Sequence, residues 1–267
     1  MSNVLTMPQG ASFSQRNLPA HWMLAQLGKR VLRPGGVDLT RRMLAALTIV
    51  STDDVVELAP GLGMTAQLAL KRRPASYTAV ERDPAAAAIV SSYLKDSRQQ
   101  CVRGNADQTG LPSEIATVVY GEAMLTMQTS DMKRRIIREA RRLLKQGGRY
   151  AIHEMCLIAD DLDEGCKKNT NRALSRVMHV GVRPLSASEW RGLMEAEGFE
   201  VEVEARAPMH LLEPNRLLRD EGVKGTLRFV WNFLRHRESR RRMLKMRKVF
   251  RRYQSDLAAV MMIGVKR

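Results

Sequence analysis

The sequence predicts an α/β protein with a doubly wound, mostly parallel sheet and helices on both faces. Short apolar runs that predict strands lie at 55–58, 77–80, 100–103, 117–120 and 149–155. Helical stretches lie between them at 65–72, 85–94 and 132–144. Parallel strands need a crossover connection, so this alternation is typical of βαβ units. A Gly-rich turn after the first run is a second indication, because open α/β sheets bind ligands where strands end.

Two further strands are predicted near the C-terminus. Residues 199–206 alternate apolar and polar side chains, and residues 257–265 form a continuous apolar run. Ser186 and Glu189 have the spacing of a capping box, which predicts a helix over 187–196. A helix therefore separates the fifth strand from the last two.

The chain of 267 residues is long enough for one large domain with a modest addition. We expect residues 51–267 to form this domain and residues 1–50 to be an N-terminal helical flap that belongs to it. A basic helical insertion at about 208–253 separates the last two strands. None of the three cysteines stands in a C-x-x-C pair, which argues against a structural metal and favours a reducing, cytoplasmic setting.

Positive charge is concentrated in two segments. The formal net charge is +16, yet residues 51–223 carry 24 basic against 25 acidic side chains. Residues 224–252 carry 12 Lys or Arg and one acid, Glu238. Residues 1–50 carry six Lys or Arg and one acid, Asp38. The middle of the chain is nearly neutral, and the excess positive charge lies in residues 1–50 and 224–252.

The stretch from Val55 to Pro84 has the pattern of a nucleoside site. Gly61 and Gly63 allow a tight turn after the first strand and a close approach of a ligand to the backbone. Glu81 ends the second strand, where a carboxylate can accept hydrogen bonds from both ribose hydroxyls. Both features lie at the carboxyl edge of the sheet, where open α/β sheets bind ligands.

Two kinds of nucleoside compete for this stretch. Gly61-x-Gly63-x-x-Ala66, with Glu81 20 residues after Gly61, fits the NAD(P) fingerprint. S-adenosylmethionine instead carries an amino-acid tail, whose ammonium group needs a negative partner. Glu57 stands near the first turn, and a buried carboxylate is costly without such a partner. We favour S-adenosylmethionine, because Glu57 would repel a pyrophosphate; the alternative is a Glu57 bonded to nearby backbone N–H groups.

Four motifs, "VVELAPGLG", "YTAVERDP", "GNADQTGLP" and "LLKQGGRYAIHEM", resemble those of class I S-adenosylmethionine-dependent methyltransferases of the small-molecule type, such as quinone-ring methyltransferases. The likeness covers roughly residues 38–206 and the final strand. It implies S-adenosylmethionine as the cofactor and a Rossmann-like sheet of seven strands whose last strand is antiparallel. The segment 257–267 suits that strand.

The resemblance also implies a set of cofactor-binding residues. Glu57 and the turn after it would surround the methionine part, Glu81 would hold the ribose, and Asp107 would meet the adenine. Glu122 would belong to the wall beside the sulfonium. The full set is Glu57, Ala59, Pro60, Gly61, Gly63, Glu81, Arg82, Asn105, Ala106, Asp107 and Glu122. Ala59 departs from the family, which has glycine there, and its methyl group is tolerable only if its φ is negative.

The catalytic residue is defined less well. Methyl transfer is a displacement at an activated sulfonium, so alignment and desolvation supply much of the rate, and a base is needed only if the acceptor must lose a proton. His153, at the end of the fifth strand, is the candidate base; the alternative is a histidine packed and hydrogen-bonded at a strand end. Residues 120–123 lack the Asn/Asp-Pro-Pro-aromatic tetrapeptide of nucleic-acid amino-methylating enzymes, which favours a small acceptor.

The basic insertion allows four interpretations. Two apolar stripes at helical spacing run through it: Leu227, Val230, Trp231 and Leu234, then Met243, Met246, Phe250 and Tyr253. The plainest interpretation is a helical pair packed by these stripes, with solvated arginines outside. The others are a cover over the acceptor pocket, an anionic-membrane contact through residues 224–252, and a nucleic-acid contact, which no RNA-binding motif supports.

We therefore expect an enzyme that transfers a methyl group from S-adenosylmethionine to a small acceptor, lipophilic or anionic. Three alternatives remain at this point. They are an NAD(P)-binding oxidoreductase of Rossmann type, an RNA methyltransferase, and a binding module without catalysis on the same fold.

Overall fold

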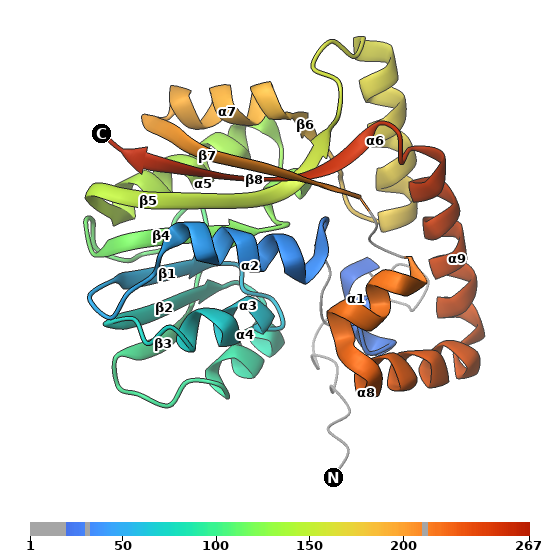
Figure 1. Ribbon diagram of the computed structural model, residues 1–267, viewed down its shortest axis with the longest axis horizontal. Coiled ribbons are helices and arrows are strands. Elements are labelled where there is room, and N and C mark those ends of the chain that lie inside the picture. The colour runs from blue at the N-terminus through green and yellow to red at the C-terminus, as the bar shows by residue number, and fades with distance from the viewer. Residues whose placement is uncertain (1–19, 30–32, 210–212) are drawn as a thin grey trace.

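In the computed structural model, which describes residues 20–29, 33–209 and 213–267, helices pack on both faces of one mixed sheet (Figure 1). The strand order is β3-β2-β1-β4-β5-β8-β7, and the short β6 pairs with β5 outside this path. The strands are β1 (Asp54–Leu58), β2 (Ser76–Glu81), β3 (Gln99–Arg103), β4 (Ala116–Glu122), β5 (Leu144–Leu157), β6 (Leu185–Ser186), β7 (Phe199–Pro208) and β8 (Leu257–Lys266).

The last strand has the opposite direction to the rest of the central sheet. β1 to β5 pair in parallel, whereas β8 is antiparallel to both of its neighbours, β5 and β7. This arrangement confirms the predicted doubly wound sheet with an antiparallel last strand. A dinucleotide-binding Rossmann sheet has the order 3-2-1-4-5-6, so the antiparallel β8 between β5 and β7 distinguishes this topology from it.

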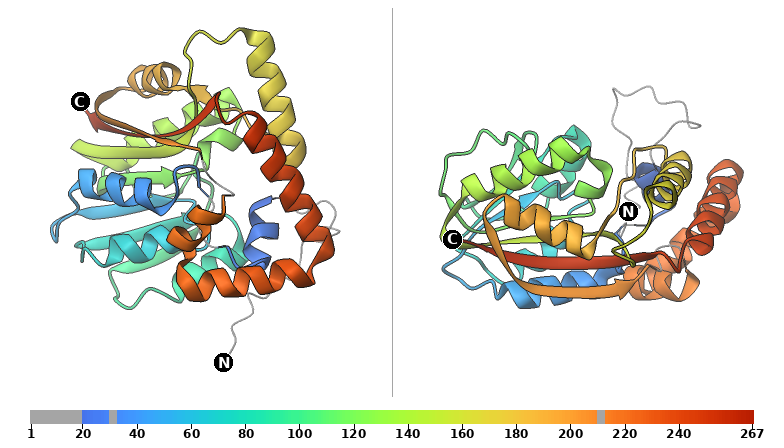
Figure 2. Two further views of the ribbon diagram at one scale, coloured as in Figure 1. Left: turned by 45° about the vertical axis from the view of Figure 1, so that its right-hand side comes forward. Right: turned by 90° about the horizontal axis from the view of Figure 1, so that it is seen from above.

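Two layers of helices cover the sheet (Figures 1 and 2). The apolar sides of α2 (Gly36–Leu47), α3 (Met64–Leu70) and α4 (Pro84–Ser91) pack on one face, and those of α5 (Ser130–Leu143) and α7 (Ala187–Ala196) pack on the other. The capping box of α7 is confirmed, because Ser186 Oγ accepts from Glu189 N and the Glu189 carboxylate accepts from Ser186 N. A single 3-10 turn, Leu125–Met127, follows β4.

A third group of helices lies beyond the carboxyl ends of the parallel strands (Figure 1, right). It contains α1 (Ala20–Gln26), α6 (Glu164–Met178), α8 (Pro214–Arg235) and α9 (Arg237–Arg252), which share an apolar core with the end of β5. α8 and α9 stand between β7 and β8 in the chain. Residues 1–19 and 30–32 of the expected flap, and 210–212 of the expected insertion, lie outside the described residues. None of the described helices is long and apolar enough to cross a membrane.

The first apolar stripe of the insertion faces solvent, so its predicted inward packing is wrong. The exposed fractions of its four side chains lie between 44% and 65%: Leu227, Val230, Trp231 and Leu234. α8 instead turns Phe229 and Phe233 inward, and their stacked rings have centroids 6.1 Å apart. Phe229 is 4% exposed, so this second apolar face of α8 is the one that enters the core. The stripe of α9 does pack inward, at Met246 and Phe250.

Candidate functional site

Four ionisable side chains come together at the carboxyl ends of neighbouring strands. Glu57 lies in β1, Glu81 ends β2, Glu122 ends β4, and His153 lies in β5. Glu122 is directly opposite His153 in the β4–β5 register. The sheet therefore brings these sequence-predicted residues to one edge, as parallel strands require.

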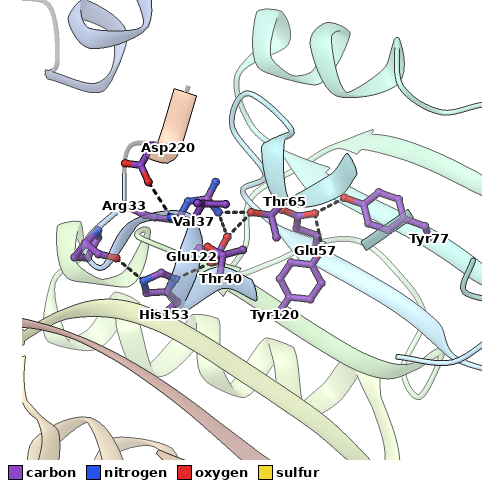
Figure 3. Close-up of polar contacts among 11 residues, drawn as sticks. Arg33, Val37, Thr40, Glu57, Thr65, Tyr77, Tyr120, Glu122, His153 and Asp220 are labelled. Carbon is purple, nitrogen blue, oxygen red and sulfur yellow. Dashed lines mark hydrogen bonds and ion pairs between the residues drawn. The ribbon is translucent and has the colours of Figure 1, made fainter. Parts of the chain in front are cut away.

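Glu57 is a buried carboxylate whose partners are tyrosine hydroxyls (Figure 3). Its side chain accepts hydrogen bonds from Tyr120, at 2.7 Å, and from Tyr77. Burial raises the pKa of Glu57 to about 7, and the nearby charge of Glu122 adds to the shift, although both tyrosines oppose it. Glu57 is thus bonded by tyrosines of the two flanking strands, β2 and β4, and not by the backbone N–H groups that the alternative interpretation expected.

Glu122 is equally enclosed but has cationic partners. Its side chain, 6% exposed, forms an ion pair with Arg33 and accepts from Thr40 at 2.6 Å and from Thr65. Burial alone would raise the pKa of Glu122, but the charge of Arg33 and the hydrogen bond and charge of His153 prevail and lower it to about 2. These partners therefore hold Glu122 in its ionised form.

His153 is fully buried and has a partner at each ring nitrogen. Nδ1 lies 2.7 Å from Glu122 Oε1, and Nε2 faces the backbone carbonyl oxygen of Pro34. Both partners offer acceptor oxygens, so each ring nitrogen already has a polar neighbour within hydrogen-bonding distance. A general base needs a free lone pair within reach of the substrate. Both ring nitrogens are engaged here, which favours the packed, hydrogen-bonded alternative, and the role of His153 as a base stays a prediction.

Arg33 is the residue at this edge that sequence reasoning missed. It is 7% exposed and bonds both Thr65, at the start of α3, and Glu122. It precedes the turn that leads into α2, a position without any motif. The only signal in the sequence was a lone basic residue before Pro34-Gly35-Gly36, and it indicated a turn rather than an ion pair with a strand 89 residues away.

The glycine turn after β1 presents its backbone to Glu81. Gly61 N donates to Glu81 Oε2 at 3.0 Å, and Asp83 N donates to Glu81 Oε1 at 2.9 Å. A Cβ at Gly61 would meet no atom within 4 Å, whereas one at Gly63 would come within 2.8 Å of the Tyr93 ring. Gly61 thus faces open space beside a carboxylate, and Gly63 allows close packing.

Ala59 departs from its expected conformation. Its φ is +53°, in the left-handed region that L-residues with a side chain seldom adopt. The condition on its methyl group, a negative φ, is therefore not met. The neighbouring Pro60 is half-buried. Ala59 keeps the turn geometry of a glycine at the cost of local strain.

The residues expected at the adenine lie further from this turn in the chain. Asn105 is exposed just after β3, and Ala106 packs against the core of the α5 face. Asp107 forms an ion pair with Arg135 of α5 at 2.8 Å. Arg82 is exposed after β2. The structure thus turns Asp107 toward α5 and leaves the polar side chains of Arg82 and Asn105 exposed.

Comparison with known proteins agrees with this geometry. A family model described as a methyltransferase domain matches residues 56–152, which run from β1 into β5. An uncharacterized protein of Haemophilus influenzae is 31% identical over 231 residues, which are 84% of this chain and 90% of that protein. The chain belongs to the class I S-adenosylmethionine-dependent methyltransferases. It is thus an enzyme whose cofactor is S-adenosylmethionine, and the oxidoreductase alternative is wrong.

Solved structures share the fold of this methyltransferase. MccD protein is 16% identical with a TM-score of 0.70, covering 88% of this chain and 100% of its own. Phosphoethanolamine N-methyltransferase 2 of Haemonchus contortus, in complex with phosphomonomethylethanolamine and S-adenosylhomocysteine, is 14% identical with a TM-score of 0.71, covering 94% and 59%. A geranyl diphosphate methyltransferase with GPP and sinefungin is 13% identical with a TM-score of 0.63, covering 86% and 78%.

No candidate metal site accompanies this edge in the part of the chain that the structure describes. Within residues 20–29, 33–209 and 213–267, no group of three or more His, Cys, Asp or Glu side chains could hold a metal ion. The polar groups of the edge bond one another and the backbone instead.

Proposed function

We propose that the carboxyl ends of β1, β2 and β4 hold S-adenosylmethionine and that the acceptor is a small molecule bound beside β4 and β5. The observation that carries this proposal is the position of Glu81 against the open backbone of Gly61. A carboxylate and an unobstructed glycine turn at the switch point of an α/β sheet fit a nucleoside.

The residues present match the parts of the cofactor. Glu81 would accept from the ribose hydroxyls, with Ala59, Pro60, Gly61 and Gly63 forming the turn around the ligand. Arg33 is a cation suited to the carboxylate of the amino-acid tail, and Glu122 is an anion suited to its ammonium. Glu57 would pair with that ammonium in its ionised form. Arg82, Asn105, Ala106 and Asp107 remain the proposed adenine side. When bound, the cofactor supplies a methyl group activated by its positive sulfonium.

The chain itself would contribute orientation and exclusion of water. Methyl transfer from an activated donor gains most of its rate from alignment and desolvation. Tyr120 and Glu122 form a firm wall at the end of β4, because both are held by hydrogen bonds. No base is assigned in this proposal, since His153 has both nitrogens engaged. A proton released by the acceptor would pass to water.

The acceptor is proposed to be lipophilic. Beyond the end of β5, α1, α6, α8 and α9 pack around one apolar core, which is proposed to border the acceptor. The residues of this core are mostly apolar: Met23, Leu24, Leu27, Met155, Leu157, Leu174, Phe229, Met246 and Phe250. In this proposal the enzyme works in the cytoplasm with residues 224–252 against an anionic membrane surface, and nucleic acid is disfavoured as a partner.

The test is calorimetry with S-adenosylmethionine, its demethylated product, NADH and NADPH. Glu81→Ala should weaken binding of the first two by about 1–3 kcal/mol, the scale of lost hydrogen bonds to a charged group. Glu164→Ala, on the exposed surface of α6, is the matched control and should bind like the wild type. Unchanged affinity in Glu81→Ala would remove Glu81 from the site.

A further inference from the structure

The outer face of α8 combines an apolar stripe with basic edges. Apart from Gly222, the exposed side chains of α8 that the structure describes are apolar or basic, and none is acidic. Five apolar ones, with exposed fractions of 44% to 66%, follow helical spacing: Val223, Leu227, Val230, Trp231 and Leu234. Isolated exposed apolar side chains are common, but a continuous row marks an interaction surface.

This row belongs to one straight piece of helix. Gly222 has φ 69° and ψ 178°, so α8 bends there and residues 223–235 form a separate segment. At 3.6 residues per turn, the five apolar side chains fall on one side of that segment. Lys224, Arg228 and Arg235 are exposed along one edge of the row. The segment lies at the periphery, beyond the sheet, where α8 meets α9 (Figure 2).

Trp231 and Arg235 link the two parts of this surface. The Arg235 guanidinium lies 4.4 Å from the centroid of the Trp231 ring, while the ring itself is 57% exposed. Arginine can cover apolar surface with its stem and keep its charge in water, and tryptophan favours the boundary between apolar and polar phases. This pair is therefore suited to the headgroup region of a bilayer.

We propose that the exposed face of α8, residues 223–235, docks this enzyme on an anionic lipid surface. The row of five exposed apolar side chains would lie at the boundary between headgroups and acyl chains, and the basic edge would lie among the headgroups. This inference extends the proposed membrane partner to a defined face and orientation. A basic amphipathic helix with Trp and Leu on its apolar side lies in the plane of such an interface.

Charge favours lipid over other occupants. A second copy of the same face would bring two basic edges together, which like-charge repulsion opposes. A nucleic acid would use the arginines, but single-stranded binding relies on open aromatic faces, and Arg235 already covers one face of Trp231. The exposed side chains of α9 add further positive charge, with Glu238 the one exposed acid among its residues.

The experiment is co-sedimentation of the full chain with phosphatidylcholine vesicles and with vesicles that also contain phosphatidylglycerol. Binding should require the anionic lipid and fall with salt, because screening weakens it. Leu227→Glu and Arg228→Glu should each reduce binding about tenfold or more, through the apolar and the electrostatic contribution respectively. Val50→Glu and Arg134→Glu, exposed elsewhere, are the matched controls and should bind like the wild type.

A second readout reports the orientation directly. Brominated acyl chains should quench the Trp231 signal, obtained as the difference between the wild type and Trp231→Phe. Equal binding to neutral and anionic vesicles, no binding to either, or binding unchanged in Leu227→Glu would each overturn the inference. Binding of duplex RNA or self-association that Leu227→Glu abolishes, without vesicle binding, would assign the face to that partner instead. Cofactor calorimetry on the same variants should be unchanged, so a failure here is distinct from a failure of the proposed cofactor site.

Discussion

Glu57 and Glu122 are buried carboxylates on adjacent strands with opposite electrostatic character. Glu57 lies opposite Tyr120 in the β1–β4 register. Tyr120 stands two residues before Glu122 in β4, so their side chains are on the same side of the strand. Burial raises the pKa of Glu57 to about 7, and the hydrogen bonds from its two tyrosine partners do not offset this. At Glu122, Arg33 and His153 outweigh the effect of burial and lower the pKa to about 2. Of these two carboxyls, Glu57 resists ionisation and Glu122 is held ionised.

Glu57→Gln should make the free enzyme more stable at alkaline pH. The folded pKa of Glu57, about 7, lies above its ordinary 4.5, so wild-type stability is full below pH 4.5 and falls as pH rises through 7. At 1.4 kcal/mol per pKa unit, the loss is about 3 kcal/mol, and the amide does not suffer it. Urea unfolding at pH 4.5 and pH 8 should show the variant's advantage only at the higher pH. A gap of equal size at both pH values would mean that Glu57 does not titrate as described.

Cofactor binding gives a second measurement on the same variant. If the ionised Glu57 pairs with the ammonium of S-adenosylmethionine, Glu57→Gln should lose cofactor affinity while gaining stability. The buried charge destabilises the free enzyme, whereas in the complex it pairs with the cofactor. Glu164→Gln, exposed on α6, should change neither quantity. Affinity equal to the wild type would assign Glu57 to structure alone.

His153→Asn separates a structural role from a base. The histidine bridges Glu122 and Pro34 and is fully buried, so its loss should lower the free energy of unfolding by about 2–3 kcal/mol and weaken cofactor binding through the Arg33–Glu122 pair. A general base would leave both unchanged and affect only turnover. Urea unfolding and calorimetry distinguish the two, with His236→Asn, exposed between α8 and α9, as the control.

Ala59→Gly tests the strain in the turn after β1. A side chain in the left-handed region costs about 1–2 kcal/mol, and part of the gain from glycine is offset by its freer unfolded chain. We expect the variant to be more stable by about 0.5–1 kcal/mol in urea unfolding. Ala88→Gly, exposed within α4, should lose about 1 kcal/mol, because its φ is helical. A destabilised Ala59→Gly would show that the turn is not strained.

Local patterns in the sequence were sufficient for the strands of the sheet and for the positions of Glu57 and Glu81, whereas the antiparallel last strand and the place of Glu122 in the site followed from the family resemblance. The carboxyl ends of parallel strands must share an edge, so strand assignment alone brought these residues together. Two features depended on tertiary packing instead. α8 carries two apolar faces, and periodicity cannot say which one the core takes. Arg33 reaches Glu122 from a turn 89 residues away, a contact that no local pattern encodes.

The segment that carries Arg33 is itself held by α8, through Asp220. Its Oδ2 lies 3.2 Å from Lys29 Nζ, and its Oδ1 accepts from Val37 N at 3.1 Å. The side chains of Lys29 and Asp220 are each only 2% exposed, so the pair is desolvated. Lys29 and Val37 flank Arg33 in the chain. Asp220 therefore positions the segment that places Arg33 on Glu122.

Asp220→Asn should lower the free energy of unfolding by about 3 kcal/mol or more, because it removes the carboxylate that pairs with the buried Lys29 ammonium. Adding Lys29→Met should restore most of that loss, since the orphaned charge is then gone. Urea unfolding of the two single variants and the double variant closes the cycle and gives the coupling energy. Cofactor affinity should fall in Asp220→Asn as well, because Arg33 loses its support. Single variants whose effects simply add would show that Lys29 is solvated and that α8 does not position this segment.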